Sequence, residues 1–229
     1  MSAYSKIMPL EDQTRRGQIV RNLRDLVISA QLPPGTRLTE TELATQLQVS
    51  RAPLREAIRE LVDIGLLQSI PYKGLFVRTV TQKDLEELYS LRTTLEKFAF
   101  ELCWDKRTPA KRKELENRHS ALITAIEADD PLHAIEQELK LHSWCYELSD
   151  HHLLQAEWGR LLPNLQFYFT LHQKAHSRSG PSIKSHNTYV SLACGDDLEA
   201  LLSHLDEHMQ QGLQKTLNFI SQYDNEAVS

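Results

Sequence analysis

The 229-residue sequence has no apolar run long enough to form a membrane span, which takes about 20 consecutive residues. Its first residues lack the apolar stretch of a secretory signal. Its three cysteines, Cys103, Cys145 and Cys194, form no CxxC motif and no even-numbered framework. These absences predict a cytoplasmic protein with no membrane partner and no disulfide bonds, whose cysteines are buried apolar side chains.

Several enzyme motifs are also missing. The sequence contains no HExxH, no GxSxG and no glycine-rich loop of the kind that cradles a phosphate. It has no internal repeat and no low-complexity tract. We therefore expect a protein that is not an enzyme.

Histidine is absent from the first 80 residues, and all ten histidines lie beyond residue 118. Charge is divided in the same way. Residues 1–80 hold 11 Lys and Arg against 8 Asp and Glu, a net +3, whereas the remainder holds 15 against 23, a net −8. The contrast predicts two domains with different partners, residues 1–80 and residues 81–229, and the basic one suits a polyanion.

The first domain shows three helical patterns and then a hairpin. Residues 14–30 place apolar side chains on one face, and Pro33-Pro34-Gly35 ends that helix. A second helix begins at Thr39, which forms a predicted capping box with Glu42, and a third begins after Ser50. Two short strands flank residues 72–74. Three helices followed by a small hairpin predict a winged helix-turn-helix.

The rest of the chain is helical throughout. Pro, Gly and Asp breaks divide it into helices over 82–104, 109–128, 131–148, 152–174, 181–194 and 197–221. The fold class is therefore mainly α, with an all-α six-helix bundle of about 145 residues after the winged helix.

Arg51, Arg55 and Arg59 recur every four residues, so they share one face of the third helix. Arginine is the usual bidentate partner of guanine, and the N-terminal end of such a helix reaches base edges in the major groove. Glu56 and Glu60 on the same helix offer an alternative, in which Arg59 pairs with acids. Phosphate contacts are expected from basic residues outside this helix, namely Lys73, Arg15, Arg16 and Arg21.

The run PPGTRLTETELATQLQVSRAPLREAIRELVDIGLLQSIPYKGLFV resembles the DNA-binding domain of the GntR family of bacterial regulators. The resemblance implies DNA contacts by Arg51, Ala52, Arg55 and the wing glycine Gly74. A further contact position of the family, often arginine, aligns with Thr41. This departure concerns the operator sequence and not DNA binding itself.

In the second domain, Glu138 and His142 lie four residues apart on one predicted helix, and His186 and His208 lie on two others. Imidazoles and a carboxylate from three helices could enclose a divalent cation. An i,i+4 pair of this kind is also common on a solvated face, and the sequence holds two rivals, His172/His176 and His204/His208.

Residues 85–221 resemble the FCD ligand-binding domain of the FadR-type branch of the family, and the six helices resemble its VanR-like subgroup. The segments that carry the likeness are LRTTLEKFAF, ELKLHSWCYELSDHHLL and the Gly-Asp before the last helix. In metal-containing members the ligands map to Glu138, His142, His186 and His208. The family's usual acid is Asp, and the extra methylene of Glu138 displaces the oxygen by about 1.5 Å, one C–C bond.

Arg92 lies on the opening helix of the bundle. In this family an arginine there can lie near the effector pocket, where a planar guanidinium suits a carboxylate. An i,i+4 ion pair with Glu96 is the alternative. The aromatic residues of the bundle are expected in its core or in a dimer interface.

The resemblance implies a homodimeric repressor that binds a pseudo-palindromic double-stranded DNA operator. A small carboxylate effector beside a divalent metal, zinc first and then manganese, nickel or iron, would control the affinity. Two alternatives remain at this point. One is a regulator whose second domain is only a dimerisation scaffold, and the other is a metal-dependent enzyme that uses Glu138 and the histidines.

Overall fold

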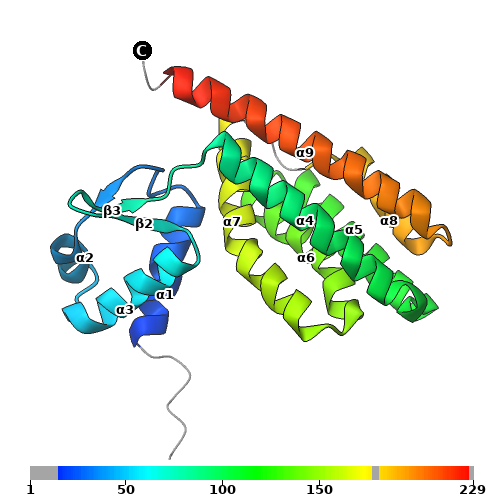
Figure 1. The fold of residues 1–229 in the computed structure, drawn as a ribbon, viewed down its shortest axis with the longest axis horizontal. Coiled ribbons are helices and arrows are strands. Elements are labelled where there is room, and N and C mark those ends of the chain that lie inside the picture. Colours follow the sequence, from blue (N-terminus) through cyan, green and yellow to red (C-terminus); the bar gives the residue numbers. More distant parts are fainter. Residues whose placement is uncertain (1–14, 177–180, 227–229) are drawn as a thin grey trace, which may run out of the picture. The chain divides into compact units, whose positions relative to one another are not determined.

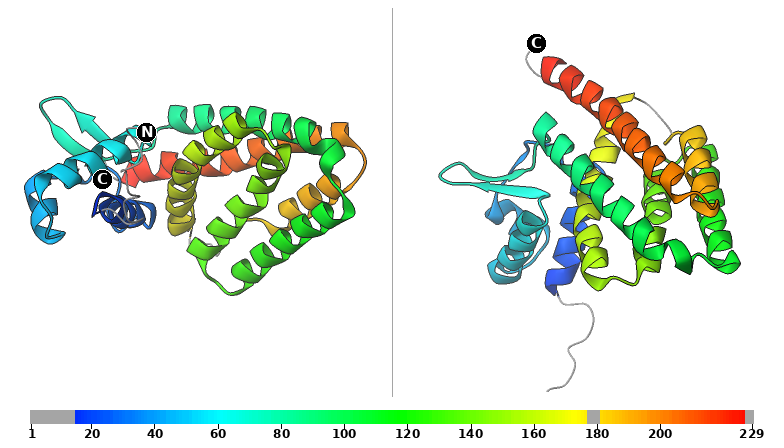
Figure 2. Two further views of the ribbon diagram at one scale, coloured as in Figure 1. Left: turned by 90° about the horizontal axis from the view of Figure 1, so that it is seen from below. Right: turned by 45° about the vertical axis from the view of Figure 1, so that its right-hand side comes forward.

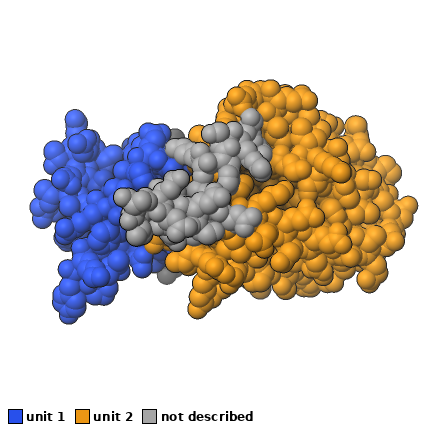
Figure 3. All heavy atoms as spheres, turned by 90° about the horizontal axis from the view of Figure 1, so that it is seen from above, with its two compact units in different colours: residues 1–78 blue, residues 79–229 orange. Residues whose placement is uncertain are grey.

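The structure is a computed structural model that describes residues 15–176 and 181–226. The chain divides into two compact units, residues 1–78 and residues 79–229, which Figure 3 colours separately. Helices dominate both units, with a small antiparallel sheet confined to the first. The expected fold class, a winged helix-turn-helix followed by an all-α bundle, is confirmed.

The first unit contains three helices and three short strands (Figure 1). In chain order they are α1 (Arg15–Ile28), β1 (Arg37–Leu38), α2 (Glu40–Gln46), α3 (Arg51–Asp63), β2 (Leu67–Ile70) and β3 (Gly74–Val77). The strand order is β1-β3-β2, and both pairings are antiparallel. The predicted hairpin is β2-β3. Strand β1 was not predicted, because two residues are too few to show a periodicity.

Helices α1 and α3 pack on each other and form the core of this unit. Their buried side chains recur at the helical spacing, with Ile19, Leu23 and Val27 on α1 and Leu54, Ile58 and Leu61 on α3. Ala57 on α3 is also buried, whereas Leu43 and Ala44 on α2 are only half-buried.

The second unit is a bundle of long helices (Figures 1 and 2). They are α4 (Gln82–Cys103), α5 (Pro109–Glu127), α6 (Pro131–Ser149), α7 (His152–His176), α8 (Ile183–Cys194) and α9 (Leu198–Glu226), with a short 3-10 helix, η1 (Trp104–Lys106), after α4. The six predicted helices agree with these within a few residues. Helix α4 packs against α9, α6 and α7, which places it at the centre of the unit.

Side-chain caps explain where these helices begin. Thr81 and Asp84 form a full capping box at the start of α4, where the Thr81 hydroxyl accepts from the Asp84 N–H and the Asp84 carboxylate accepts from the Thr81 N–H. Thr108 and Asp130 cap α5 and α6, each followed by a proline in the first turn. The predicted box at Thr39 is only half formed, because Glu42 accepts from the Thr39 hydroxyl instead of its N–H.

Across the described ranges, no helix is both long and apolar enough for a membrane crossing. The helices instead bury their apolar sides within the bundle, around Phe100, Trp144, Tyr146, Phe167 and Tyr189. Two charged residues, Arg92 and Glu96, share the buried face of α4 with apolar neighbours. Burying charged groups is costly, so a charged pair inside an apolar core is a candidate functional site.

Candidate functional site

The exposed side of α3 carries the predicted recognition residues. Arg51 is the first residue of the helix, and Arg51, Ala52 and Arg55 are all exposed. Leu54 and Leu61 lie on the opposite, buried side of the helix. The N-terminal half of α3 therefore presents two guanidinium groups outward, in the arrangement that a major-groove helix requires.

Acidic side chains hold two of the predicted DNA contacts in this unit. The Arg55 Nε donates to Glu40 Oε2 on α2 at 2.7 Å. The Arg16 Nη2 on α1 lies 2.9 Å from Glu60 Oε2. Among the described residues Arg59 makes no ion pair, so the acid Glu60 is used by α1 and not by its own helix. Arg15 is exposed, as a phosphate contact requires.

The wing is the turn between β2 and β3. The Lys73 N–H donates to the Ile70 carbonyl, which closes the turn and leaves the Lys73 side chain exposed. Tyr72 and Gly74 have φ values of +63° and +115°. The value at Gly74 lies in a region that side chains rarely adopt, so glycine is required there by the backbone.

No sequence pattern indicated that Arg37 lies beside the wing. Arg37 is exposed on β1, and a Cβ built on Gly74 would lie 3.6 Å from its Nε. The pairing of β1 with β3 brings this guanidinium beside the wing. Thr41, the predicted contact on α2, is exposed on the surface of its helix.

Inside the second unit the structure brings together three of the four predicted metal ligands. Ring nitrogens of His142 on α6, His186 on α8 and His208 on α9 lie within 4.8 Å of one another. The ring centroids are 5.0–5.5 Å apart. His142 and His186 are buried, while His208 is partly accessible. Of the rival pairs, His208 belongs to this group, while the side chain of His176 lies outside the described residues.

Each of these imidazoles has one nitrogen fixed by a neighbour. His142 Nδ1 lies 2.6 Å from Glu96 Oε1, His186 Nδ1 lies 2.9 Å from the Ser182 carbonyl oxygen, and His208 Nδ1 lies 2.8 Å from Ser185 Oγ. A carbonyl oxygen only accepts, so His186 carries its proton on Nδ1. The Nε2 atoms of His142 and His186 are buried and have no hydrogen-bond partner. Such lone pairs, oriented by a second contact on the same ring, are typical of metal-binding histidines.

Glu138 lies at the edge of this group. Its Oε1 is 3.5 Å from His186 Nε2, and the residue is buried. It is not among the atoms within 4.8 Å of one another. The fourth predicted ligand, Glu138, therefore lies next to His186 and outside the group formed by the three histidines.

Burial keeps His142 and His208 neutral. It lowers the pKa of His142 well below its usual value, and the nearby charge of Arg92 lowers it further. Burial also lowers the pKa of His208 to about 2, with a further contribution from His142. A neutral imidazole is the form that binds a metal ion.

Arg92 forms the expected ion pair with Glu96, and its role toward an effector stays a prediction. Its Nε lies 3.4 Å from Glu96 Oε2, and the two side chains are 2% and 0% exposed. Its Nη2 is buried without a hydrogen-bond partner. The rings of Trp158 and Phe169 lie 5.8 Å from the guanidinium carbon, so Arg92 is enclosed by aromatic faces.

The sequence predicted only an ion pair between Glu96 and Arg92. In the structure Glu96 also contacts His142 and Tyr189. One of its oxygens contacts the Nδ1 of His142 and also accepts from the Tyr189 hydroxyl at 3.0 Å, while the other faces Arg92. The residue thereby connects the guanidinium to the histidine group. Its position on a buried helical face, four residues after Arg92, was a signal that the sequence contained.

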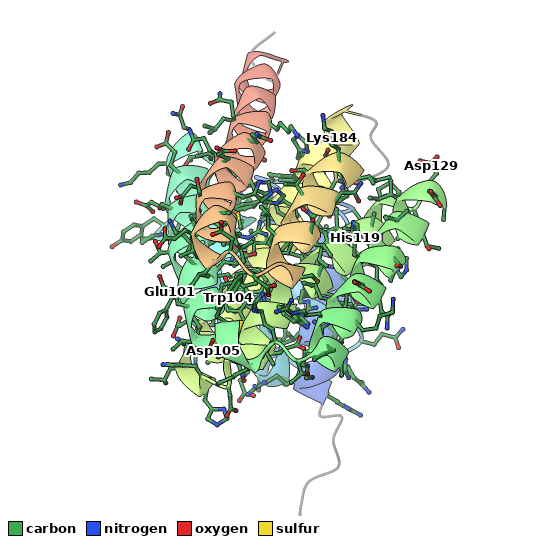
Figure 4. All side chains as sticks on the ribbon, turned by 90° about the vertical axis from the view of Figure 1, so that its right-hand side faces the viewer. Glu101, Trp104, Asp105, His119, Asp129 and Lys184 are labelled. Carbon is green, nitrogen blue, oxygen red and sulfur yellow. The ribbon has the colours of Figure 1, made fainter. Side chains whose placement is uncertain are left out.

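A cavity of about 170 Å³ opens beside this group. Arg92, Glu138, His186 and His208 contribute to its wall, as do residues of α7 and α9. Figure 4 shows the side chains of the bundle, with His119 on α5 and Lys184 near the start of α8. A histidine group and a buried guanidinium therefore face one small polar space.

These features define a class: a winged helix-turn-helix protein with an exposed basic helix and a second, all-helical domain that encloses a polar cavity. Residues 15–77 match the family described as bacterial regulatory proteins, gntR family. Residues 87–211, more than half of the chain, match the FCD domain. The chain belongs to the GntR family of regulators that carry an FCD domain.

Three relatives show this likeness over most of their length. The HTH-type regulator YdhC of Bacillus subtilis is 27% identical over 83% of this chain and 86% of that protein. McbR of Escherichia coli is 28% identical over 86% of this chain and 90% of its own length, and its structure, with a TM-score of 0.74, covers 92% of this chain and 99% of that one. The gluconate operon repressor of B. subtilis is 23% identical over 83% and 80% of the two chains. The chain is thus a transcription regulator and not an enzyme.

Proposed function

We propose that this protein is a homodimeric repressor whose operator affinity is set by a small carboxylate bound next to a divalent metal. The observation that carries the proposal is the group of three histidines, with buried Nε2 atoms that lack partners, beside an enclosed guanidinium. Buried nitrogens usually have partners, and here the atoms without one also face other imidazole nitrogens within 4.8 Å. The six helices of the bundle support the VanR-like subgroup. A repressor of chromosomal DNA would act in the cytoplasm.

Residues 1–80 form the DNA-binding domain of this proposal. Arg51 and Arg55 recognise guanine edges, with Ala52 and Thr41 beside them on the same surface. Lys73, Gly74, Arg15 and Arg16 lie against phosphates. A two-fold symmetric dimer would meet a pseudo-palindromic operator with two such surfaces. Arg16 exchanges Glu60 for a phosphate when DNA binds, while Arg55 keeps Glu40 at its Nε and donates to a guanine from its Nη nitrogens.

Residues 81–229 form the ligand-binding and dimerisation domain. His142, His186 and His208 would hold the metal ion, with Glu138 as the carboxylate next to them. The residues fit such an ion, because the His142 Nε2 is buried without a partner and the His186 Nε2 has only the Glu138 carboxylate beside it, at 3.5 Å. The bound ion would supply a Lewis-acid site with positions open to a carboxylate. A set of imidazole and carboxylate ligands favours zinc. Manganese, nickel and iron also bind ligands of these kinds.

Arg92 is the proposed effector-binding residue. Its Nη2 lacks a partner and the side chain lines the cavity, so a carboxylate there would complete its hydrogen bonds. Effector binding changes operator affinity only if the two arrangements of the dimer bind the effector with different affinity. The name of the gluconate operon repressor, which acts on an operon for an organic acid, supports repression as the mode.

The first test is metal content. Purified full-length protein should hold about one equivalent of metal per protomer, measured by elemental analysis without chelators. His142→Ala should lose it, because removing one of three imidazoles from a site of this kind costs about 10–100-fold in affinity or more. His133→Ala is the matched control, since His133 lies on the same helix and is 49% exposed. A folded wild-type protein that takes up no added metal would refute the metal site.

A second measurement separates sensor from scaffold. Operator affinity is measured with and without metal, and with and without candidate acids, for the wild type and for Arg92→Gln. Under the proposal the acid changes operator affinity in the wild type and not in the variant. If no acid has an effect and the dimer still binds its operator, the second domain serves dimerisation alone.

A further inference from the structure

One wall of the cavity carries a polar atom that the proposed metal and Arg92 do not use. Gln173 on α7 lines the cavity and is 6% exposed. Its Oε1 is buried and has no hydrogen-bond partner among the described residues. A buried acceptor without a donor is unfavourable, and native proteins nearly always satisfy it with protein, water or ligand. The atom therefore indicates a donor that the chain itself does not provide.

The position of Gln173 relates this acceptor to Arg92. Gln173 follows Phe169 by four residues on α7, so both side chains project from the same face, about one helical turn apart. The Phe169 ring lies 5.8 Å from the Arg92 guanidinium carbon. A ligand whose anionic end meets Arg92 would thus extend along α7 toward the Gln173 amide.

Charge and size limit what the donor can be. Arg92, Lys215 and Glu138 all line the cavity, and the proposed divalent metal adds to the positive side of this balance, so a cationic donor such as an ammonium group would meet a net positive wall. A neutral hydroxyl donates without that cost. The cavity measures about 170 Å³, and a cavity of about 150 Å³ holds a six-carbon ring. The ligand is therefore small, on the order of six to nine non-hydrogen atoms.

We propose that the effector is a small hydroxycarboxylic acid, whose carboxylate binds at Arg92 and the histidine group and whose hydroxyl donates to Gln173 Oε1. This inference rests on the proposed function, since it takes the same cavity as the effector site. It adds the residue that discriminates among acids. A site built to satisfy a hydroxyl rejects the analogue that lacks it, because the buried acceptor is then left unpaired.

The test compares matched pairs of acids on the full-length protein, with one equivalent of Zn²⁺ and without it. The pairs are lactate and propionate, 3-hydroxybutyrate and butyrate, and malate and succinate, and binding is measured by titration calorimetry. We expect at least one hydroxy acid to bind the wild type at least about tenfold more tightly than its partner. In Gln173→Leu that ratio should fall to about threefold or less, while the affinity for the deoxy acid stays the same.

Gln166→Leu is the matched control, because Gln166 lies on the same helix and does not line the cavity. It should keep the wild-type ratio. Acids that bind the wild type without any preference for a hydroxyl, and that are lost in Arg92→Gln, would overturn the role of Gln173 and leave the proposed function intact. A preference for pyruvate over lactate would also overturn it, since the amide would then present its N–H. If none of the six acids binds, the hydroxycarboxylate inference fails, and the operator measurements with other acids still decide the proposed function.

Discussion

Charged side chains are used in opposite ways in the two units. In the first unit the ion pairs Arg55–Glu40 and Arg16–Glu60 have side chains that are 39–57% exposed. In the second, Arg92, Glu96 and His142 meet with side chains that are 0–2% exposed. Exposed pairs are worth little and exchange partners readily, which suits a surface that binds and releases phosphates. Buried charges are costly to enclose, so they are retained where a ligand needs a fixed, dry partner.

This comparison predicts that removing one charge has a large effect in the bundle and a small one in the winged helix. Glu96 is the sharpest case, because its carboxylate serves Arg92, His142 and Tyr189 together. Without it the buried guanidinium loses its nearest counter-ion. Glu96→Ala should therefore lower the free energy of unfolding by about 3–5 kcal/mol.

The measurement is urea unfolding followed by tryptophan fluorescence. All three tryptophans, Trp104, Trp144 and Trp158, belong to residues 79–229, so the signal reports the second unit alone. Glu101→Ala is the matched control, since Glu101 is an exposed acid on the same helix. A loss in Glu96→Ala no greater than in this control would show that the buried group is not the stabilising unit that the geometry implies.

The second prediction tests the exposed side of the comparison through DNA affinity. Arg51→Ala with Arg55→Ala should weaken binding to an operator selected from a random library by about 3 kcal/mol, on the order of 100-fold. Stability should stay nearly the same, because both side chains are exposed. Fluorescence anisotropy at fixed salt gives the affinity. Unchanged operator affinity in the double variant would mean that α3 is not the recognition helix.

The third prediction concerns acid. Burial lowers the pKa values of His142 and His208 in the folded protein, the latter to about 2, while unfolded histidine titrates near 6.5. Below pH ~6.5 the unfolded chain binds protons that the folded chain does not, so stability falls as pH falls. Two such groups give a slope of about 2.7 kcal/mol per pH unit.

Chelator-treated protein is the sample for this measurement, unfolded in urea between pH 7 and pH 5 with tryptophan detection. His142→Asn with His208→Asn should remove most of the slope. His133→Asn should not, since that side chain is 49% exposed. A wild-type slope equal to that of the double variant would contradict the neutral, buried state of the two rings.

The sequence predicted the helices well because their signals are local. Proline after Thr108 and after Asp130 gave the starts of α5 and α6, and the apolar spacing gave the faces of α1 and α3. Strand β1 was not predicted, because its two residues form a strand only through pairing with β3, and no local sequence pattern contains that contact. Arg37 was missed for the same reason.

The candidate site could be predicted only in part, because its geometry depends on how helices pack. Spacing placed His142, His186 and His208 on three helices, and the fold brings them within 4.8 Å of one another. The role of Glu96 required the α4–α6 packing, which turns an apparent i,i+4 pair with Arg92 into a support for His142. Gln173 gave no sequence signal at all, since an unpaired acceptor is visible only once its surroundings are known.

The smallest predicted effect tests whether the exposed pairs position their arginines. Glu40 accepts from the Nε of Arg55, which leaves both Nη nitrogens free to donate to a guanine. Glu40→Gln should weaken discrimination between the operator and a duplex altered at one guanine by about two- to fivefold, the effect of an exposed ion pair. Affinity for unrelated DNA should rise slightly, because a negative charge is removed. Glu42→Gln makes the same charge change on α2 away from Arg55. If both variants lose the same discrimination, Glu40 acts through charge alone and does not orient Arg55.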